Sequence, residues 1–215
     1  MTVDFQSRVV PLTLSILFCA TTAFAGEIRE FNLETTRRLG RELAQVSQRP
    51  DRGATSSVKK RAIETAKAAL QGKLFKGVDY NYIVVDDPDG NGFLVYALAQ
   101  SKSEIILGGH FRVTVSAKGE KAERVDALSH TLLRQPPPPK GYEGEKPISV
   151  SMSQIVSNKP LETCVYTSLH DKVIVSVGMV NDNAKVWMFV GDQIFEMTPE
   201  MMKQMEQDSK KEKNK

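Results

Sequence analysis

The chain has 215 residues, of which 40% are hydrophobic and 26% are charged, and its formal net charge is +3. This composition is that of an ordinary globular protein. The Lys and Arg residues are scattered among the acidic residues and form no basic stripe, so nucleic acid is excluded as an expected partner.

The first 25 residues predict a cleavable secretory signal peptide. Arg8 precedes an apolar run from Val9 to Ala20, and the small-residue box Ala23-Phe24-Ala25 follows. The run is shorter than the roughly 20 residues that a spanning helix needs. We therefore expect cleavage after Ala25, a periplasmic or secreted protein, and no transmembrane span after signal removal. The mature chain keeps one cysteine, Cys164, so no intramolecular disulfide is expected.

The first mature segments predict two amphipathic helices. Apolar residues recur near a helical period from Ile28 to Val46, and this helix should end before Pro50. A second apolar stripe runs from Ile63 to Leu74, with Ser56 or Ser57 as its cap.

An antiparallel β-meander is expected to follow. The runs 80–85 and 93–98 flank the turn-forming run 86–92, which is typical of a β-hairpin. A third strand is expected from about 105 to 116, and a more polar fourth strand ends near Leu128. The predicted class is therefore α+β, with N-terminal helices packed on the meander.

A proline-rich stretch divides the predicted organisation into parts. Pro136 to Pro139 and the glycines after them predict a linker over 135–147. It separates a helix-plus-meander domain at 26–134 from a small antiparallel β region with a C-terminal helix at 148–208, and a charged tail follows at 209–215.

Beyond the linker, the sequence predicts three strands and a final helix. The strands are expected at 163–169, 173–178 and 185–190. Thr198 and Pro199 predict the start of the helix, because threonine caps helices and proline is favoured at the first helical position.

The sharpest chemical signal is the loop that begins at Asp87. Asp87, Asp89 and Asn91 have the spacing that gathers oxygen ligands around Ca²⁺. Leu98 stands where a complete Ca²⁺ loop places a bidentate glutamate, and both flanks are predicted strands. The pattern favours an ordinary hairpin loop, with weak Ca²⁺ binding as the alternative and no other cofactor expected.

A second constellation surrounds His110 and Arg112. Strand alternation sends His110, Arg112 and Thr114 to one face. Arg112 offers a bidentate donor fork, His110 offers a titratable donor, and Gly109 permits a close backbone approach. This face would suit an anionic group, and the alternative is a β-bulge with an ordinary solvent face.

A cysteine nucleophile is suggested by Cys164, with His170 as base and Asp171 as the group that orients it. In the predicted strand, the thiol and the imidazole would lie about 20 Å apart. A buried free thiol is therefore favoured.

A copper site is suggested by Met197, Met201 and Met205, which repeat at four-residue spacing. Thioethers bind Cu(I), but methionines at helical spacing more often fill a hydrophobic seam.

The residue order between about 80 and 130 resembles a family of uncharacterised secreted bacterial proteins. The resemblance rests on Tyr82, Gly92-Phe93, Tyr96, Gly108 to Val113, Gly119 and Leu128-Ser129. It implies export and directs attention to Gly109, His110 and Arg112, but it implies no activity. The helix-plus-meander layout also resembles the cystatin-like and PepSY-like folds, in which small secreted domains bind or inhibit other proteins.

Three functional hypotheses follow. The first is a non-enzymatic periplasmic or secreted binding or inhibitory module that uses the face around His110 and Arg112. Its partner would be another envelope protein or an anionic small ligand. The second is a cysteine-dependent hydrolase or transferase that uses Cys164, and the third is a Ca²⁺- or Cu(I)-responsive module.

Overall fold

The computed structural model describes residues 27–135, 149–180, 185–201 and 203–204. The expected signal peptide, nearly all of the expected linker and the charged tail lie outside the described residues. In chain order the elements are α1 (Leu33–Ser47), α2 (Ser57–Ala69), β1 (Asp79–Asp86), β2 (Phe93–Gln100), β3 (Ile105–Ile106), β4 (Phe111–Val115), β5 (Ala122–Ala127), β6 (Arg134–Gln135), β7 (Ser149–Gln154), α3 (Glu162–Asp171), β8 (Ile174–Met179), β9 (Val186–Val190) and β10 (Gln193–Met197).

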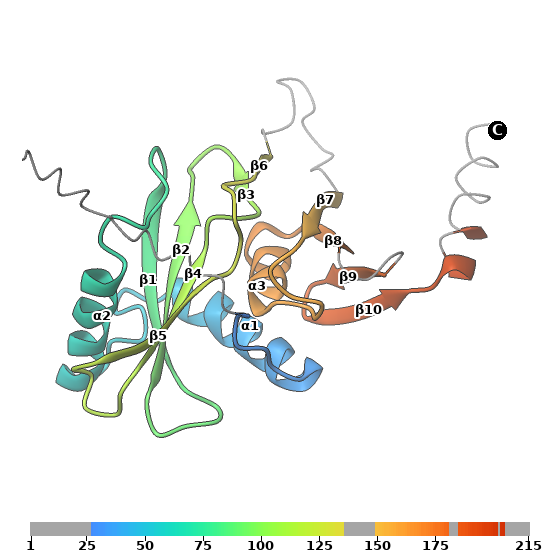
Figure 1. Cartoon of the computed structure of the whole chain (residues 1–215). Helices are drawn as coiled ribbons and strands as arrows, with labels where there is room; N and C mark the ends of the chain where they lie inside the picture. The colour runs from blue at the N-terminus through green and yellow to red at the C-terminus, as the bar shows by residue number, and fades with distance from the viewer. Residues whose placement is uncertain (1–26, 136–148, 181–184, 202, 205–215) are drawn as a thin grey trace, which may run out of the picture.

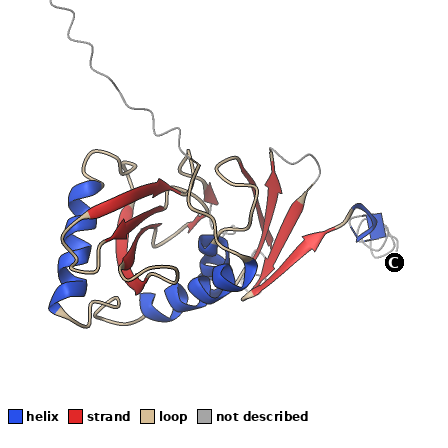
Figure 2. Ribbon diagram, turned by 60° about the horizontal axis from the view of Figure 1, so that its bottom comes forward, coloured by secondary structure: helices blue, strands red, loops and turns tan. Residues whose placement is uncertain are grey.

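The elements stack in four layers, which confirms the predicted α+β class. One sheet has the strand order β1-β2-β4-β5, the other has the order β10-β9-β8-β7, and β3 pairs with β6. Helix α2 covers one face of the first sheet, and α1 and α3 lie between the two sheets (Figures 1 and 2). One hydrophobic cluster extends from the first sheet through both central helices to the second sheet, so the two halves share a core.

Helix α1 has a polar N-cap, Asn32. The Asn32 side chain accepts a hydrogen bond from the Thr35 amide at 2.8 Å. Ile28 and Phe31, which the sequence placed in or near this helix, lie before it and are buried. Within the helix, a Cβ atom at Gly40 would lie 2.4 Å from the Cβ of Val165, so glycine allows α3 to approach α1 closely.

The predicted second helix, hairpin and meander are confirmed, with one difference. The expected third strand is divided into β3 and β4, because the chain turns at Gly109, where φ is +83°. Strand β3 pairs with β6 rather than extending β4.

The strand predicted at 163–169 is wrong, because these residues lie within helix α3. The segment is rich in β-branched residues, which favoured a strand, but the helix is buried on nearly all sides between the sheets. Seven of its residues are buried: Glu162, Thr163, Cys164, Val165, Tyr166, Thr167 and Ser168. Helix α3 connects β7 to β8, and these two strands are parallel.

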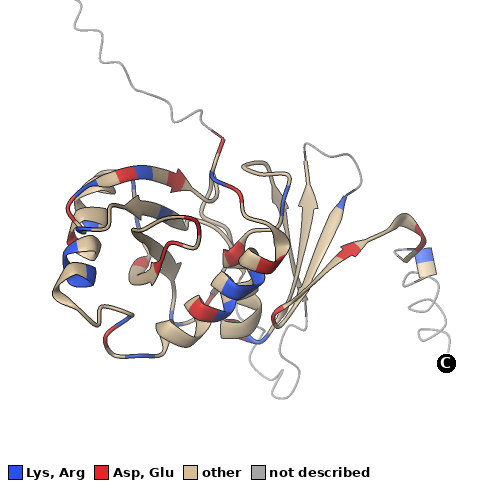
Figure 3. Ribbon diagram, turned by 90° about the horizontal axis from the view of Figure 1, so that it is seen from below, with Lys and Arg blue, Asp and Glu red and all other residues tan. Residues whose placement is uncertain are grey.

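The C-terminal helix begins at Pro199, as predicted, and the Thr198 hydroxyl accepts a hydrogen bond from the Met201 amide at 3.3 Å. Among the described residues, no helix has the length and hydropathy required to cross a bilayer. Helices α1 and α2 carry more basic than acidic residues, whereas the second sheet carries few charges (Figure 3).

Candidate binding groove

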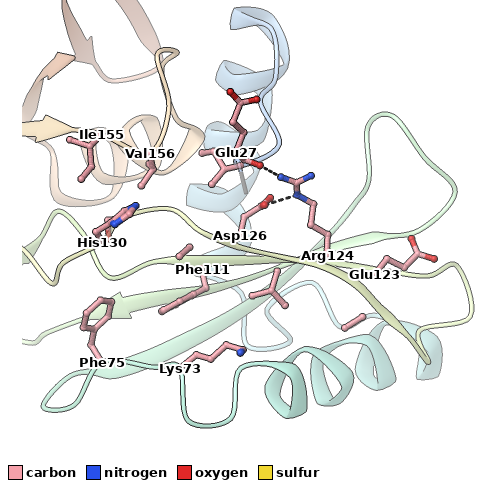
Figure 4. Close-up of a pocket in the computed structure, with 15 residues that line it drawn as sticks. Glu27, Lys73, Phe75, Phe111, Glu123, Arg124, Asp126, His130, Ile155 and Val156 are labelled. Atoms are coloured by element: carbon pink, nitrogen blue, oxygen red, sulfur yellow. Dashed lines mark hydrogen bonds and ion pairs between the residues drawn. The ribbon is translucent and has the colours of Figure 1, made fainter. Parts of the chain in front are cut away.

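A groove of about 890 Å³ runs along β5. Strand β5 is the outer strand of the first sheet, and the groove extends to both sides of it (Figure 4). On one side lie Lys73, Phe75 and Phe111, and on the other lie Ile155 and Val156. These walls come from segments that are far apart in the sequence.

Within the described residues, alternate backbone positions of β5 have no hydrogen-bond partner and lie along this groove. The Leu128 amide donates to the His110 carbonyl at 2.9 Å, and the same register pairs Asp126 with Arg112. Hydrogen-bonded and non-hydrogen-bonded pairs alternate in an antiparallel ladder. The backbone N–H and C=O groups of Val125 and Ala127 therefore point away from β4 and along the open edge.

The polar residues of β5 are held in place by a buried ion cluster. The Arg112 guanidinium donates to Asp126 at 2.8 Å and to Glu162 at 2.5 Å. Arg124 donates to the other Asp126 oxygen at 2.6 Å, and its guanidinium also reaches the Glu27 carbonyl. Asp126 thus faces the groove with both oxygens already engaged by arginines.

The cluster joins both halves of the chain. Arg112 donates to the Arg29 carbonyl, and its guanidinium lies 4.7 Å from the centre of the Phe31 ring. The Tyr96 hydroxyl donates to Glu162 at 2.8 Å. Burial alone would lower the pKa of Arg112, but Glu162 and its other partners raise the pKa above its usual range, so the side chain stays charged.

The sequence predicted an open polar face at His110 and Arg112, and this is wrong. Both side chains are buried, at 2% and 0% exposure. They face the helices between the sheets, a layer that the strand alternation could not reveal. The His110 Nδ1 accepts from the Ala99 amide at 3.1 Å, and burial lowers the pKa of His110 to about 4, so the ring is neutral.

The other two residues of the predicted binding face, Gly109 and Thr114, have their polar groups directed into the fold. The Gly109 amide donates to the Ser129 hydroxyl and its carbonyl accepts from the Tyr80 hydroxyl. The Thr114 hydroxyl is buried and has no hydrogen-bond partner among the described residues. The proposed role of these residues in ligand binding stays a prediction.

In the Asp87 loop, an arginine side chain occupies the place where the sequence suggested a Ca²⁺ ion. Arg29 donates to both Asp87 oxygens at 2.7 Å and to Asp89 at 3.0 Å. Asn91 is exposed. Burial would raise the pKa of Asp87, but the hydrogen bonds from Arg29 lower it below its usual value. No group of three or more metal-ligating His, Cys, Asp or Glu side chains gathers within the described residues.

Cys164 lies in the shared core, and its surroundings disfavour a nucleophile. Burial raises the pKa of the Cys164 thiol to about 12, so the thiol is protonated at neutral pH. His170 lies six positions further along α3, where it stacks on Tyr166 and contacts Asp171 at 3.0 Å. Met197 is buried and Met201 is exposed, whereas Met205 lies outside the described residues.

The sequence did not reveal the groove itself. Its floor, Arg124 and Asp126, could have been linked to Arg112 by the register of the predicted strands. Its walls at Phe75 and Ile155 carry no local signal, because only the packing of the two halves brings them together. The exposed His130 lies on the rim of the groove (Figure 4).

Comparisons with family models, curated proteins and solved structures find no match to this chain. The resemblance to secreted bacterial proteins and to cystatin-like or PepSY-like layouts stays a prediction.

Proposed function

We propose that the protein is a non-enzymatic binding module of the periplasm or the extracellular space, and that the groove along β5 is its surface for another protein. The observation that carries the proposal is an open edge strand recessed between two partly apolar walls. A volume of about 890 Å³ lies near the upper end of the range for ligand sites.

The charges around the groove support a protein partner over a small anion. Arg124 and Arg112, the nearest guanidinium groups, already bind Asp126. Lys73 and Glu123 place opposite charges on the groove lining. A surface with mixed charge and apolar walls is typical of a protein interface.

Site-directed photocrosslinking tests the proposal. A benzoylphenylalanine at position 123, on the exposed rim of the groove, should give one discrete adduct when the mature protein meets its own cell-envelope extract. The matched control is position 45, where the exposed Gln45 lies on α1. No adduct at 123, or the same adducts at both positions, would contradict the proposal.

The captured protein must then bind through the groove when purified. We expect Ile155→Asp to weaken its binding at least about tenfold, because a charge replaces a half-exposed apolar wall. Val190→Asp adds the same charge at an exposed position on the second sheet and should leave binding unchanged. Equal effects of the two substitutions would count against the groove.

A further inference from the structure

We propose that an extended segment of the partner protein adds to β5 as a fifth strand of the first sheet. This inference rests on the proposed function and specifies how the groove recognises its partner. Strand addition needs an edge with free backbone donors and acceptors, and the outward groups of Val125 and Ala127 provide them. Strand β5 has six residues, so about 20 Å of edge is available.

The walls define the side chains that the added strand should carry. Successive side chains of a strand point to opposite faces of its sheet. One set would meet Phe75 and Phe111, and the other would meet Ile155 and Val156 (Figure 4). Both sets meet apolar groups, so the segment should be apolar at neighbouring positions rather than strictly alternating.

A smaller pocket continues the groove and offers a place for one anchoring side chain. It has a volume of about 80 Å³ and shares Ser129, His130, Ile155 and Val156 with the groove. Its remaining lining consists of three apolar residues, Leu128, Leu133 and Met152, and three polar residues, Thr131, Ser153 and Gln154. This volume exceeds that of a single water site several-fold. An aliphatic side chain of the added strand suits this pocket.

The position of β5 favours a free segment over a second copy of the chain. The strand lies between walls on both sides, so a narrow extended segment reaches its edge more easily than the β5 edge of a second intact copy. The chain's own segments are also poor candidates. Pro136 to Pro139 lack backbone donors, and the described C-terminal end lies beyond β10, on the side of the second sheet away from β5 (Figure 1).

The test begins with eight-residue peptides selected from a phage-displayed random library on the mature protein. Binding of the synthetic peptides is measured by fluorescence polarisation. Val125→Pro removes one outward donor but no bond to β4, so it should weaken binding at least about tenfold. Val125→Ala, the matched control, should change binding less than about threefold.

Methylation of the peptide backbone gives a signature that side-chain docking lacks. N-methyl groups at one set of alternating positions should abolish binding, and those at the other set should be tolerated. Replacing the aliphatic anchor with alanine should weaken binding, and Thr131→Trp at the mouth of the small pocket should remove this preference. If Val125→Pro fails to fold, Ala127→Pro and the methylated peptides carry the same test.

The outcomes separate this inference from the proposed function. Strand addition would be overturned if peptide binding did not depend on which alternating positions are methylated and were unchanged by Val125→Pro. The groove would then remain a binding site of another kind. A partner that crosslinks at position 123 when no peptide binds would also overturn strand addition. Self-association that Val125→Pro abolishes would show a second copy in the groove and overturn the inference. Absence of both crosslinks and peptide binding would overturn the proposed function itself.

Discussion

The two edges of the first sheet differ in how far other segments of the chain cover their backbone groups. At the β1 edge, the Val84 amide donates to the Arg52 carbonyl at 3.1 Å, and a Cβ atom at Gly53 would lie 2.2 Å from the Val84 carbonyl. The loop before α2 therefore closes this edge at its middle. At the β5 edge, the Arg112 side chain binds Asp126 and so holds β5 against β4, and no other strand of the described residues pairs with β5. The β1 edge is therefore protected against pairing, whereas the β5 edge has the outward backbone groups that the proposed strand addition requires.

Removal of the anchor behind β5 should have the largest effect. Arg112→Met leaves Glu162 buried without its cation and leaves Asp126 with Arg124 alone, and we expect a loss of about 3–5 kcal/mol in the free energy of unfolding. Denaturant unfolding measures this loss. Arg61→Met is the matched control, because Arg61 and Glu120 form an exposed pair whose removal should cost under about 1 kcal/mol. Equal losses would show that β5 needs no anchor.

Acid should lower the free energy of unfolding through His110, whose carbonyl binds the Leu128 amide next to β5. The unfolded-state pKa of histidine is about 6.5 and the folded pKa is lowered to about 4, so the unfolded chain binds the proton first. Stability is fully present above about pH 6.5 and falls as the pH drops toward 4, by on the order of 3 kcal/mol.

The measurement for His110 is urea unfolding of wild type and His110→Asn between pH 7 and pH 4. The variant should lack this part of the pH dependence, because asparagine has no proton to gain in this range. The difference between the two proteins isolates His110 from the carboxylates that titrate nearby. Parallel profiles would mean that the ring is not held neutral by its burial.

The sequence predicted the local elements of the fold better than their surroundings. The caps at Asn32 and Ser56 and the hairpin around Asp87 depend on neighbouring residues, and the hairpin and second helix were predicted correctly. The sequence predicted a strand at helix α3 because the helix is buried on nearly all sides between two sheets and so shows no amphipathic helical pattern. The site was predicted least, since its walls meet only after the two halves pack.

The same limit explains why the sequence predicted that Arg112 is exposed. Alternation correctly put Arg112 and His110 on one face of the sheet, but it could not show that two helices cover that face. Polar residues on a strand favour solvent unless a partner is known, and Glu162 lies 50 positions away in the sequence. Only the register of β4 with β5 carried a usable signal, through Arg112 and Asp126.

Proline substitutions should distinguish the two edges directly. Val84→Pro removes the amide that binds Arg52, and we expect it to cost about 2 kcal/mol more than Val84→Ala. Val125→Pro should differ from Val125→Ala by less than about 1 kcal/mol, because no strand of the described residues pairs with that amide. Thermal and denaturant unfolding of the four variants measure both differences. A large cost at Val125 would indicate that the β5 edge is already paired within the chain.

The smallest effect is expected at the Arg29 and Asp87 pair, which fixes the segment that forms one wall of the groove. The folded pKa of Asp87 lies below its unfolded value of about 3.9, so the pair stabilises the fold above that pH. This contribution, roughly 1 kcal/mol, is lost as the pH falls below about 4 and should be missing from Arg29→Gln. Because the guanidinium already bridges Asp87 and Asp89, millimolar Ca²⁺ should not change the melting temperature of the wild type. A Ca²⁺-dependent rise that Asp87→Asn abolishes would show that the cation displaces Arg29, and the wall of the groove would then respond to calcium.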